Sequence, residues 1–350
     1  MTRELLNPRE RFGLLVIDEP QDRVPVYPLV TSRAARVLGK TVREYCTDGI
    51  TMARCQLAAQ DRFGHDFISL FSEVGLVAEA LGSAYDYPED DVPMLLRPRW
   101  RGLPEESDLS DVSDPSDGRV RMFLSAVEYA WEARSDTVPV LAFIPAPFTT
   151  AQQLVDPEEF LLGLLTAPEQ AKGLLDWVTR ATVALTRKVI EAGGLPVFVD
   201  PLASGSVISG EQFREFALPY EAGVIRFCHR YDLDIILHVC GDDAPVMSLL
   251  PETGADLLSI DLIGLDRAIA AAGGRCRVVG NFPTTQLWLA SPAEVGSAAG
   301  EMVRQGRACP KGFVAATGCE VPHDTPDENI DAFVAACREA GTNRAFGQQS

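Results

Sequence analysis

Short apolar runs alternate with helical patterns along most of the chain. Eight runs predict β-strands, and from the third onward they are almost continuously apolar, as in a parallel sheet covered on both faces. These runs are Val24–Val30, Asp66–Phe71, Val138–Ile144, Leu195–Asp200, Asp234–Cys240, Asp256–Asp261, Arg277–Phe282 and Gly312–Cys319.

Between the runs, apolar residues recur at spacings of three and four, which is typical of amphipathic helices. The predicted helices are Pro168–Ala192, Glu211–Arg230, Pro292–Gln305 and Pro326–Ala340. Gly193-Gly194 follows the first of them as a terminator. For the last, we expect Thr325 to be the N-cap and Pro326 to occupy the first helical position.

Eight strands alternating with helices favour a (β/α)8 TIM barrel, which needs about 250 residues. The remaining residues of the 350 predict an N-terminal extension and an excursion around residues 72–137, within one domain spanning 1–350. The Ser-, Asp- and Pro-rich stretch Arg101–Gly118 is expected to be a solvated loop. A doubly wound open sheet is the competing architecture, although neither G-x-G-x-x-G nor G-x-x-x-x-G-K-[ST] occurs.

The charge balance limits the classes of binding partner that the protein can have. Lys and Arg number 31 against 50 Asp and Glu, a formal charge of −19 at pH 7. A surface this acidic is a poor partner for nucleic acid and for anionic membranes. The sequence shows neither a signal-peptide core nor a membrane-spanning run, which predicts a cytoplasmic protein whose eight cysteines are reduced.

Polar side chains gather where the predicted strands end, which is where a TIM barrel has its active site. His238 and Cys240 are two residues apart on one strand, so both side chains face the same side, and Cys319 ends the last strand. One imidazole and two thiolates make a three-ligand zinc site with a fourth position open for substrate. For a single His or Cys, packing in the core is the competing interpretation.

Four further residues close the neighbouring strands: Asp200, Ser204, Asp261 and Asn281. Their shared level at one mouth predicts substrate binding or support of the ligand imidazole, with strand termination or helix capping as the alternative. The other histidines, His65, His229 and His323, are expected to be solvated or to cap helices. No G-x-S-x-G motif occurs, so acyl-enzyme hydrolysis lacks support.

Three stretches resemble the uroporphyrinogen decarboxylase superfamily: HVCGDDAPVMSLLPETGADLLSID, VVGNFPTTQLWLASPAEV and GFVAATGCEVPHDTPDENI. Similarity in order and spacing extends over roughly residues 8 to 341, and the closer resemblance is to the corrinoid-dependent methyltransferase branch, typified by methylcobamide:coenzyme M methyltransferase. The His-x-Cys … Cys zinc motif of that branch maps onto His238, Cys240 and Cys319. The resemblance implies a (β/α)8 barrel.

It also implies a zinc-dependent methyltransferase. A zinc-bound thiolate acceptor would attack the methyl group of methylcobalamin or another methyl-corrinoid and leave cobalt(I), so no general acid is needed. The sequence contains no Asp-x-His-x-x-Gly signature of a cobalamin module, and the resemblance therefore implies a separate corrinoid protein as partner. The small-molecule acceptor is a thiol such as coenzyme M or, as in other relatives, tetrahydrofolate.

Two alternatives remain open. A uroporphyrinogen-decarboxylase-type decarboxylase would use the same barrel without zinc. However, the segment VYPLVTSRAARVLG lacks the arginine-glutamine-alanine-glycine-arginine pattern of the decarboxylases, and the acidic composition disfavours a polycarboxylate substrate. A barrel that binds a corrinoid or a protein without catalysis is the other alternative, and zinc analysis separates it from the methyltransferase.

Overall fold

Eight parallel strands form the centre of the molecule. The computed structural model describes residues 5–109 and 118–346. The strands are hydrogen-bonded in the order β1-β10-β9-β8-β7-β6-β5-β2. Their bounds are β1 Val26–Leu29, β2 Ile68–Leu70, β5 Val140–Pro145, β6 Leu195–Val199, β7 Ile236–His238, β8 Leu257–Ser259, β9 Arg277–Phe282 and β10 Phe313–Glu320. The eight predicted strands and the (β/α)8 TIM barrel are confirmed.

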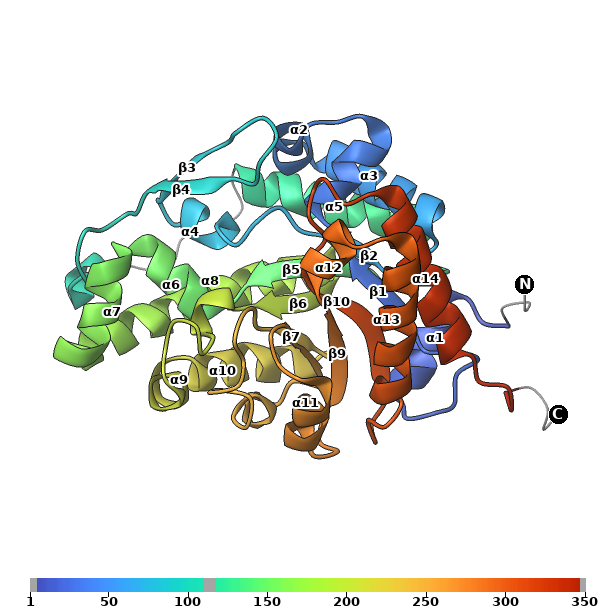
Figure 1. Cartoon of the computed structure of the whole chain (residues 1–350). Coiled ribbons are helices and arrows are strands. Elements are labelled where there is room, and N and C mark those ends of the chain that lie inside the picture. Colours follow the sequence, from blue (N-terminus) through green and yellow to red (C-terminus); the bar gives the residue numbers. More distant parts are fainter. Residues whose placement is uncertain (1–4, 110–117, 347–350) are drawn as a thin grey trace.

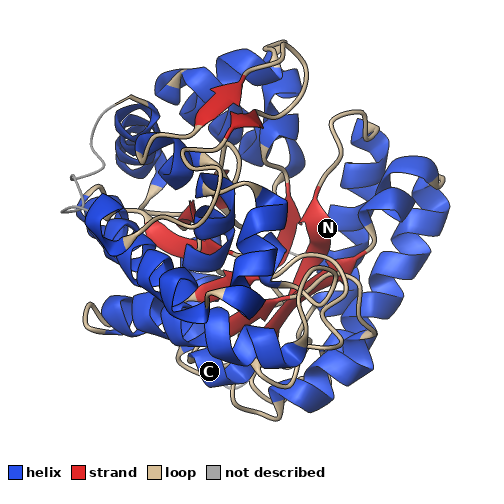
Figure 2. Cartoon of the chain, turned by 90° about the vertical axis from the view of Figure 1, so that its left-hand side faces the viewer, coloured by secondary structure: helices blue, strands red, loops and turns tan. Residues whose placement is uncertain are grey.

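Helices surround this sheet (Figures 1 and 2). One principal helix follows each strand. In chain order these helices are α3 Gly49–Phe63, α5 Arg119–Arg134, α8 Pro168–Glu191, α10 Leu218–His229, η4 Leu250–Thr253, α11 Leu265–Ala272, α13 Pro292–Gly306 and α14 Asp327–Gly341. Shorter helices in the connections are η1 Ser32–Leu38, α2 Val42–Thr47, α4 Leu76–Ala80, η2 Glu106–Asp108, α6 Pro147–Leu154, α7 Pro157–Thr166, η3 Pro201–Ala203, α9 Gly210–Phe216 and α12 Thr284–Leu289. In the described residues, no helix is long and apolar enough to cross a membrane.

Side chains alternate between two apolar clusters, as the period of a strand requires. Tyr27, Phe143, Val197 and Val279 belong to the cluster inside the barrel. Their neighbours along the strands pack against the helices in a larger cluster. Side chains at the inward positions near the strand ends therefore reach the mouth of the barrel.

The predicted N-terminal extension forms α1 (Pro8–Val16), which closes the opposite end of the barrel. Phe12 and Leu15 of α1 join the interior cluster. Both α1 and α14 lie on the same side of the molecule, to the right in Figure 1, while α7 lies on the other side. Because α1 closes one end of the barrel, a ligand can enter at the other end, at the mouth formed by the carboxyl ends of the strands.

Asp66 joins the two outer strands of the sheet. Its N–H donates to the carbonyl oxygen of Val26 at 2.9 Å, and its carboxylate accepts from the Val26 N–H at 2.6 Å. The same carboxylate pairs with Arg11 of α1 and with Arg23. All of these groups are buried. Asp66 therefore closes the β1–β2 seam at its start and holds α1 against this end of the barrel.

The predicted excursion contains α4 and a hairpin of β3 (Ala84–Asp86) and β4 (Met94–Arg97), seen at the upper left of Figure 1. Residues 110–117 of the predicted solvated loop Arg101–Gly118 lie outside the described residues.

Two helix predictions need correction. The helix predicted over Glu211–Arg230 is two helices, α9 and α10, which meet at Ala217, because Pro219 has no N–H to continue the first helix and starts the second. Thr325 is not an N-cap: Pro326 takes the cap position, the Thr325 hydroxyl has no partner, and its carbonyl accepts from Arg33.

The expectation for His65 is also wrong. Its side chain is 0% exposed, and neither ring nitrogen has a side-chain partner. It lies between the end of α3 and Asp66. His229 is exposed near the end of α10 and contacts Asp256 at 2.9 Å.

Candidate metal centre

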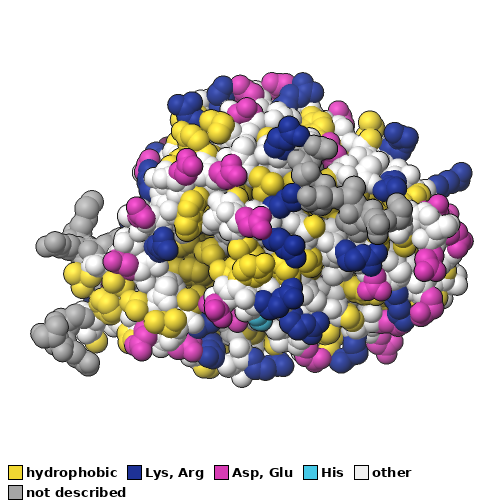
Figure 3. Space-filling view, turned by 180° about the vertical axis from the view of Figure 1, so that it is seen from behind, with side chains coloured by type: hydrophobic (Ala, Val, Ile, Leu, Met, Phe, Trp, Pro, Cys, Tyr) yellow, Lys and Arg dark blue, Asp and Glu magenta, His cyan; other side chains and the backbone are white. Residues whose placement is uncertain are grey.

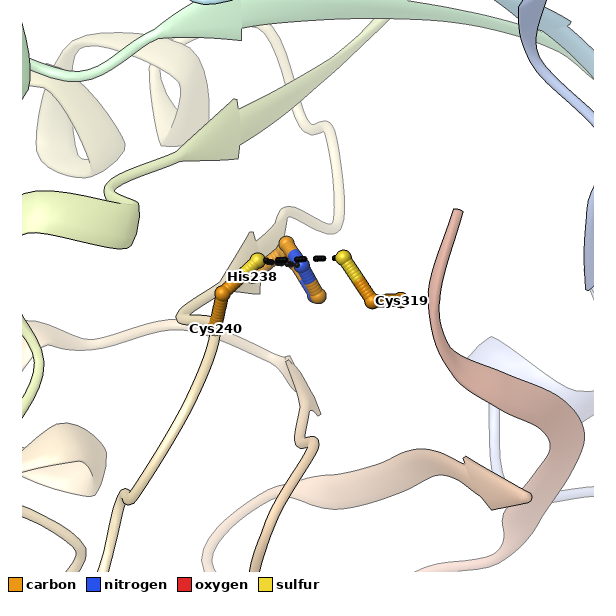
Figure 4. Close-up of side chains that lie close together, drawn as sticks. All are labelled: His238, Cys240 and Cys319. Carbon is orange, nitrogen blue, oxygen red and sulfur yellow. Dashed lines mark hydrogen bonds between the residues drawn. The ribbon is translucent and has the colours of Figure 1, made fainter. Parts of the chain in front are cut away.

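His238, Cys240 and Cys319 come together at the mouth of the barrel (Figure 4). Nε2 of His238 lies 2.7 Å from Sγ of Cys240, and the two sulfur atoms are 3.4 Å apart. One ligand atom from each residue lies within 4.8 Å of the others. The three residues that the sequence pattern selected are therefore neighbours in space.

Each of the three side chains is positioned by a strand end. His238 is the last residue of β7, and Cys240 follows two residues later at the start of the loop. Cys319 is near the end of β10, where the pairing with β1 shifts: Tyr27 faces Ala316, but Leu29 faces Glu320. Strict alternation from Ala316 would direct Cys319 away from the interior. The irregularity in β10 re-aims its side chain toward Cys240.

Ser259 fixes the orientation of the imidazole. Its Oγ lies 2.9 Å from Nδ1 of His238, because β7 and β8 pair with His238 opposite Ser259. When Nδ1–H donates to this hydroxyl, Nε2 keeps its lone pair on the side of the two sulfur atoms. A hydrogen bond of this kind to the second ring nitrogen is typical of histidine metal ligands.

The three groups also influence each other's protonation. The hydrogen bond from Cys240, together with the contact to His238, lowers the pKa of Cys319 to about 4. The hydrogen bond to Cys319 and burial raise the pKa of Cys240. Burial opposes protonation of His238, but its hydrogen bond to Cys319 raises its pKa. A lowered pKa at Cys319 favours the thiolate, the form of cysteine that binds metals.

Asp261 connects the two loops that carry the cysteines. Its Oδ2 accepts from the N–H of Gly241 at 2.9 Å, next to Cys240. Its Oδ1 lies against Gly318, next to Cys319, where a Cβ would come within 2.5 Å. The predicted support role for Asp261 is therefore consistent with its position, and the close approach explains a glycine at 318.

Two other carboxyl groups lie beside the cluster. Asp243 is fully buried, and its Oδ2 accepts from the N–H of Asp261 at 3.1 Å. Burial raises the pKa of Asp243 to about 7. Burial and the neighbouring Cys319 likewise raise the pKa of Glu320 to about 7, and the Thr31 hydroxyl donates to this carboxylate.

Asp200 and Asn281 make structural contacts. Asp200 is fully buried, and its Oδ1 accepts from the Thr149 N–H at 2.8 Å, so it caps the first turn of α6, whose own cap residue is Ala146. Burial raises the pKa of Asp200 to about 6, and burial next to Asp200 raises the pKa of Glu221. Asn281 donates through Nδ2 to the carbonyl oxygens of Asp261 and Ile263, at 2.9 and 2.5 Å.

Ser204 is also buried, beside the loop that follows β7. A Cβ on Gly241 would lie 3.6 Å from its Oγ. The structure thus places Asp261 and Ser204 next to the segment that carries Cys240, whereas Asn281 steadies the segment after β8.

Three residues near the cluster escaped the sequence interpretation: Ser259, Asp243 and Glu320. Ser259 occupies an inward position of the run Asp256–Asp261, and Glu320 directly follows Cys319. Their proximity to strand ends was a usable signal. Their partners depend on strand register, which the sequence pattern does not provide.

The donor set fits a zinc ion. One imidazole nitrogen and two sulfur atoms converge, and Ser259 orients the imidazole, so three of the four positions of a tetrahedral zinc shell have a ligand. The soft sulfur ligands favour zinc over magnesium or calcium.

Comparison with known proteins gives the family. The sequence profile of the family Uroporphyrinogen decarboxylase (URO-D) matches residues 7–340. The chain belongs to this family. The match covers nearly the whole barrel, including all three residues of the cluster, and confirms the resemblance found in the sequence.

Two relatives of this URO-D family member are named as methyltransferases. Methylated-thiol–coenzyme M methyltransferase of Methanosarcina mazei is 29% identical over 269 residues, covering 76% of this chain and 71% of that protein. Methylcobamide:CoM methyltransferase MtbA of Methanosarcina acetivorans is 24% identical over 339 residues, covering 95% and 97%.

A solved structure supports the fold of this URO-D family member. A methyltransferase from Methanosarcina mazei superimposes with a TM-score of 0.87 at 24% identity, covering 95% of this chain and 99% of that one. The architecture is therefore shared over nearly the full length of both chains.

Proposed function

We propose that this protein is a zinc-dependent methyltransferase that moves a methyl group from a corrinoid carried by a partner protein to a small thiol. The observation that carries the proposal is the convergence of His238, Cys240 and Cys319 at the barrel mouth. The names of the relatives, which include methylcobamide and coenzyme M, support the reaction class.

His238, Cys240 and Cys319 would hold the zinc ion. When bound, zinc supplies a Lewis acid that keeps an acceptor thiol in its reactive thiolate form at neutral pH. Two cysteine thiolates balance the charge of the dication, so the acceptor meets a centre of low net charge.

The residues around the ligands have positioning roles. Ser259 holds the imidazole of His238 so that Nε2 faces the sulfur atoms. Asp261 fixes the residues adjacent to both cysteines, Gly241 and Gly318. This rigid arrangement leaves the acceptor sulfur as the part that has to align with the methyl group.

The buried carboxyl groups are not needed as general acids. The leaving group of the transfer is a cobalt centre, which takes the electron pair of the broken bond and requires no proton. The Asp261 carboxylate accepts from the N–H of Gly241 and the Asp243 carboxylate accepts from the N–H of Asp261, which agrees with positioning rather than proton transfer.

The test is the cleavage of methylcobalamin, followed by its visible absorbance, with the purified protein and a thiol. We expect cobalt–carbon cleavage with one equivalent of methyl thioether formed, and loss of both in Cys319→Ser. A decarboxylase without zinc, or a barrel that only binds corrinoid, would leave methylcobalamin unchanged with every thiol.

A further inference from the structure

The outer face of α8 carries its charges in a fixed order. Glu169 and Asp176 lie in the N-terminal half of the helix, and their side chains are exposed. Arg180 and Arg187 lie in the C-terminal half and are exposed as well. Their spacings of 7, 11 and 18 residues from Glu169 place all four side chains within about 40° of one another around the helix axis. They form one straight stripe, acidic at one end and basic at the other.

Most charges of this stripe have no counter-ion in the described chain. Asp176 and Arg180 are one helical turn apart, yet they form no ion pair with each other or with any other described residue. Arg187 lies over the ring of Phe227, with its guanidinium carbon 5.7 Å from the ring centroid. Arg230 lies over the same ring at 4.7 Å. An aromatic ring, and not a carboxylate, therefore positions the basic end of the stripe.

The helices beside α8 repeat this order of charge. Next to the N-terminal half, Lys172 is shared by Glu169 at 3.1 Å and by Glu215 of α9 at 2.8 Å, so this end keeps a negative charge. Next to the C-terminal half, α10 packs against α8 and presents the exposed Arg226, with the exposed Arg230 directly after its end. Figure 3 shows Lys and Arg gathered in the lower middle of the side that is hidden in Figure 1, and mostly Asp and Glu toward the right-hand edge.

The stripe is complementary to a second copy of itself. When two α8 helices lie against each other in opposite directions, Asp176 can face Arg180 of the partner subunit. The same register places Glu169 opposite Arg187 of the partner subunit, because both pairs are centred on Val178. A two-fold axis at this point produces each of the two contacts twice, as in an isologous interface.

We propose that two copies of this chain associate through antiparallel pairing of their α8 helices, with the two-fold axis at Val178. Each chain carries a formal charge of −19, so two chains repel each other in most orientations, and a contact requires a local match of opposite charges. Gly173 lies between the two acidic positions of the stripe and has no side chain to keep the helices apart.

This arrangement leaves both metal centres open. The helix α8 follows β5 and precedes β6, so it runs from the mouth of the barrel back to the closed end. Two antiparallel α8 helices therefore point the two mouths in opposite directions. A partner protein can reach each mouth without crossing the contact between the two chains, and the inference does not depend on methyl transfer.

Sedimentation velocity of the wild-type protein over a range of concentrations tests the association, and we expect a reversible monomer–dimer equilibrium. Arg180→Glu with Arg187→Glu makes the stripe acidic throughout and should raise the dissociation constant of the dimer at least roughly tenfold. Glu169→Arg with Asp176→Arg makes it basic throughout and should have the same effect. Arg304→Glu reverses an exposed charge on α13 and should leave the constant unchanged.

A mixture of the two double variants tests the register of charges. Each variant should be monomeric alone, whereas an equimolar mixture should form a one-to-one heterodimer, because an acidic stripe then faces a basic one. The heterodimer also shows that both variants are folded. If the order of charges serves only the dipole of a single helix, the mixture stays monomeric.

Three results would overturn the inference: wild-type protein that is monomeric up to roughly 100 µM, a dimer that survives either double variant, or a mixture that forms no heterodimer. Zinc content and methyl transfer are measured separately. Their failure would overturn the proposed function without affecting the contact between the two chains.

Discussion

Nδ1 of His238 lies 2.9 Å from Oγ of Ser259, its direct neighbour across the β7–β8 pair. The contact selects the side of the imidazole that faces Cys240 and Cys319. A hydroxyl on one strand thus determines how a ligand on the next strand is presented.

Replacing Ser259 by Ala should weaken zinc binding by about 10- to 100-fold, because the imidazole loses its orienting partner. Competition with a chromophoric chelator measures the affinity. Ser259→Thr keeps the hydroxyl and should recover most of it. Equal affinities in the Ala variant and the wild type would show that His238 is oriented without Ser259.

Gly318→Ala should also weaken zinc binding, by about tenfold. The new Cβ would come within 2.5 Å of Oδ1 of Asp261, so either Asp261 or the adjacent Cys319 has to move. Gly296→Ala is the matched control, since a Cβ there has no neighbour closer than 3.9 Å. An unchanged affinity in Gly318→Ala would argue against a rigid link between the two cysteine loops.

The Asp66 network predicts a large effect on stability. Asp66→Asn removes the charge that Arg11 and Arg23 share in a buried site and should lower the free energy of unfolding by about 3–5 kcal/mol. Asp331→Asn removes a carboxylate that pairs with Arg62 on the surface and should cost about 1 kcal/mol or less. Denaturant unfolding compares the two, and similar losses would contradict the closing role of Asp66.

His65 predicts a pH dependence. Burial lowers its pKa from 6.5 to about 4, so the folded state binds fewer protons than the unfolded state between these values. Its contribution to stability is present above about pH 6.5 and is lost as the pH falls toward 4. Wild-type protein should therefore lose roughly 3 kcal/mol more than His65→Phe over this range. If the free energies of unfolding of the wild type and of His65→Phe fall in parallel as the pH is lowered, His65 is not the source of this pH dependence.

Much of the architecture was predictable because parallel strands covered on both faces leave continuous apolar runs. The segments Val138–Ile144 and Arg277–Phe282 illustrate this, and each coincides closely with β5 or β9. The helix Glu211–Arg230 failed because the hydrophobic period continues across Pro219, whereas the backbone hydrogen bonds do not.

At the site, the period of a strand predicts that the side chains of His238 and Cys240 lie on the same face. It does not predict that Cys319 lies close to them. Simple alternation would have turned Cys319 outward, and the register shift opposite Leu29 brings it back. The contacts that Ser259 and Asp261 make with the site depend on how β7, β8 and β10 align. Such alignment is a tertiary property, so periodicity in one segment does not contain it. The burial of His65 is likewise a tertiary property that the local sequence does not show.

The central claim is that His238, Cys240 and Cys319 form one zinc site, and zinc stoichiometry by elemental analysis tests it most directly. Wild-type protein should contain one zinc per chain, Cys240→Ser and Cys319→Ser should lose it, and Cys309→Ala, a buried cysteine elsewhere, should retain it. Wild-type protein that binds no zinc after equilibration with the metal, or full zinc occupancy in both serine variants, would contradict the account.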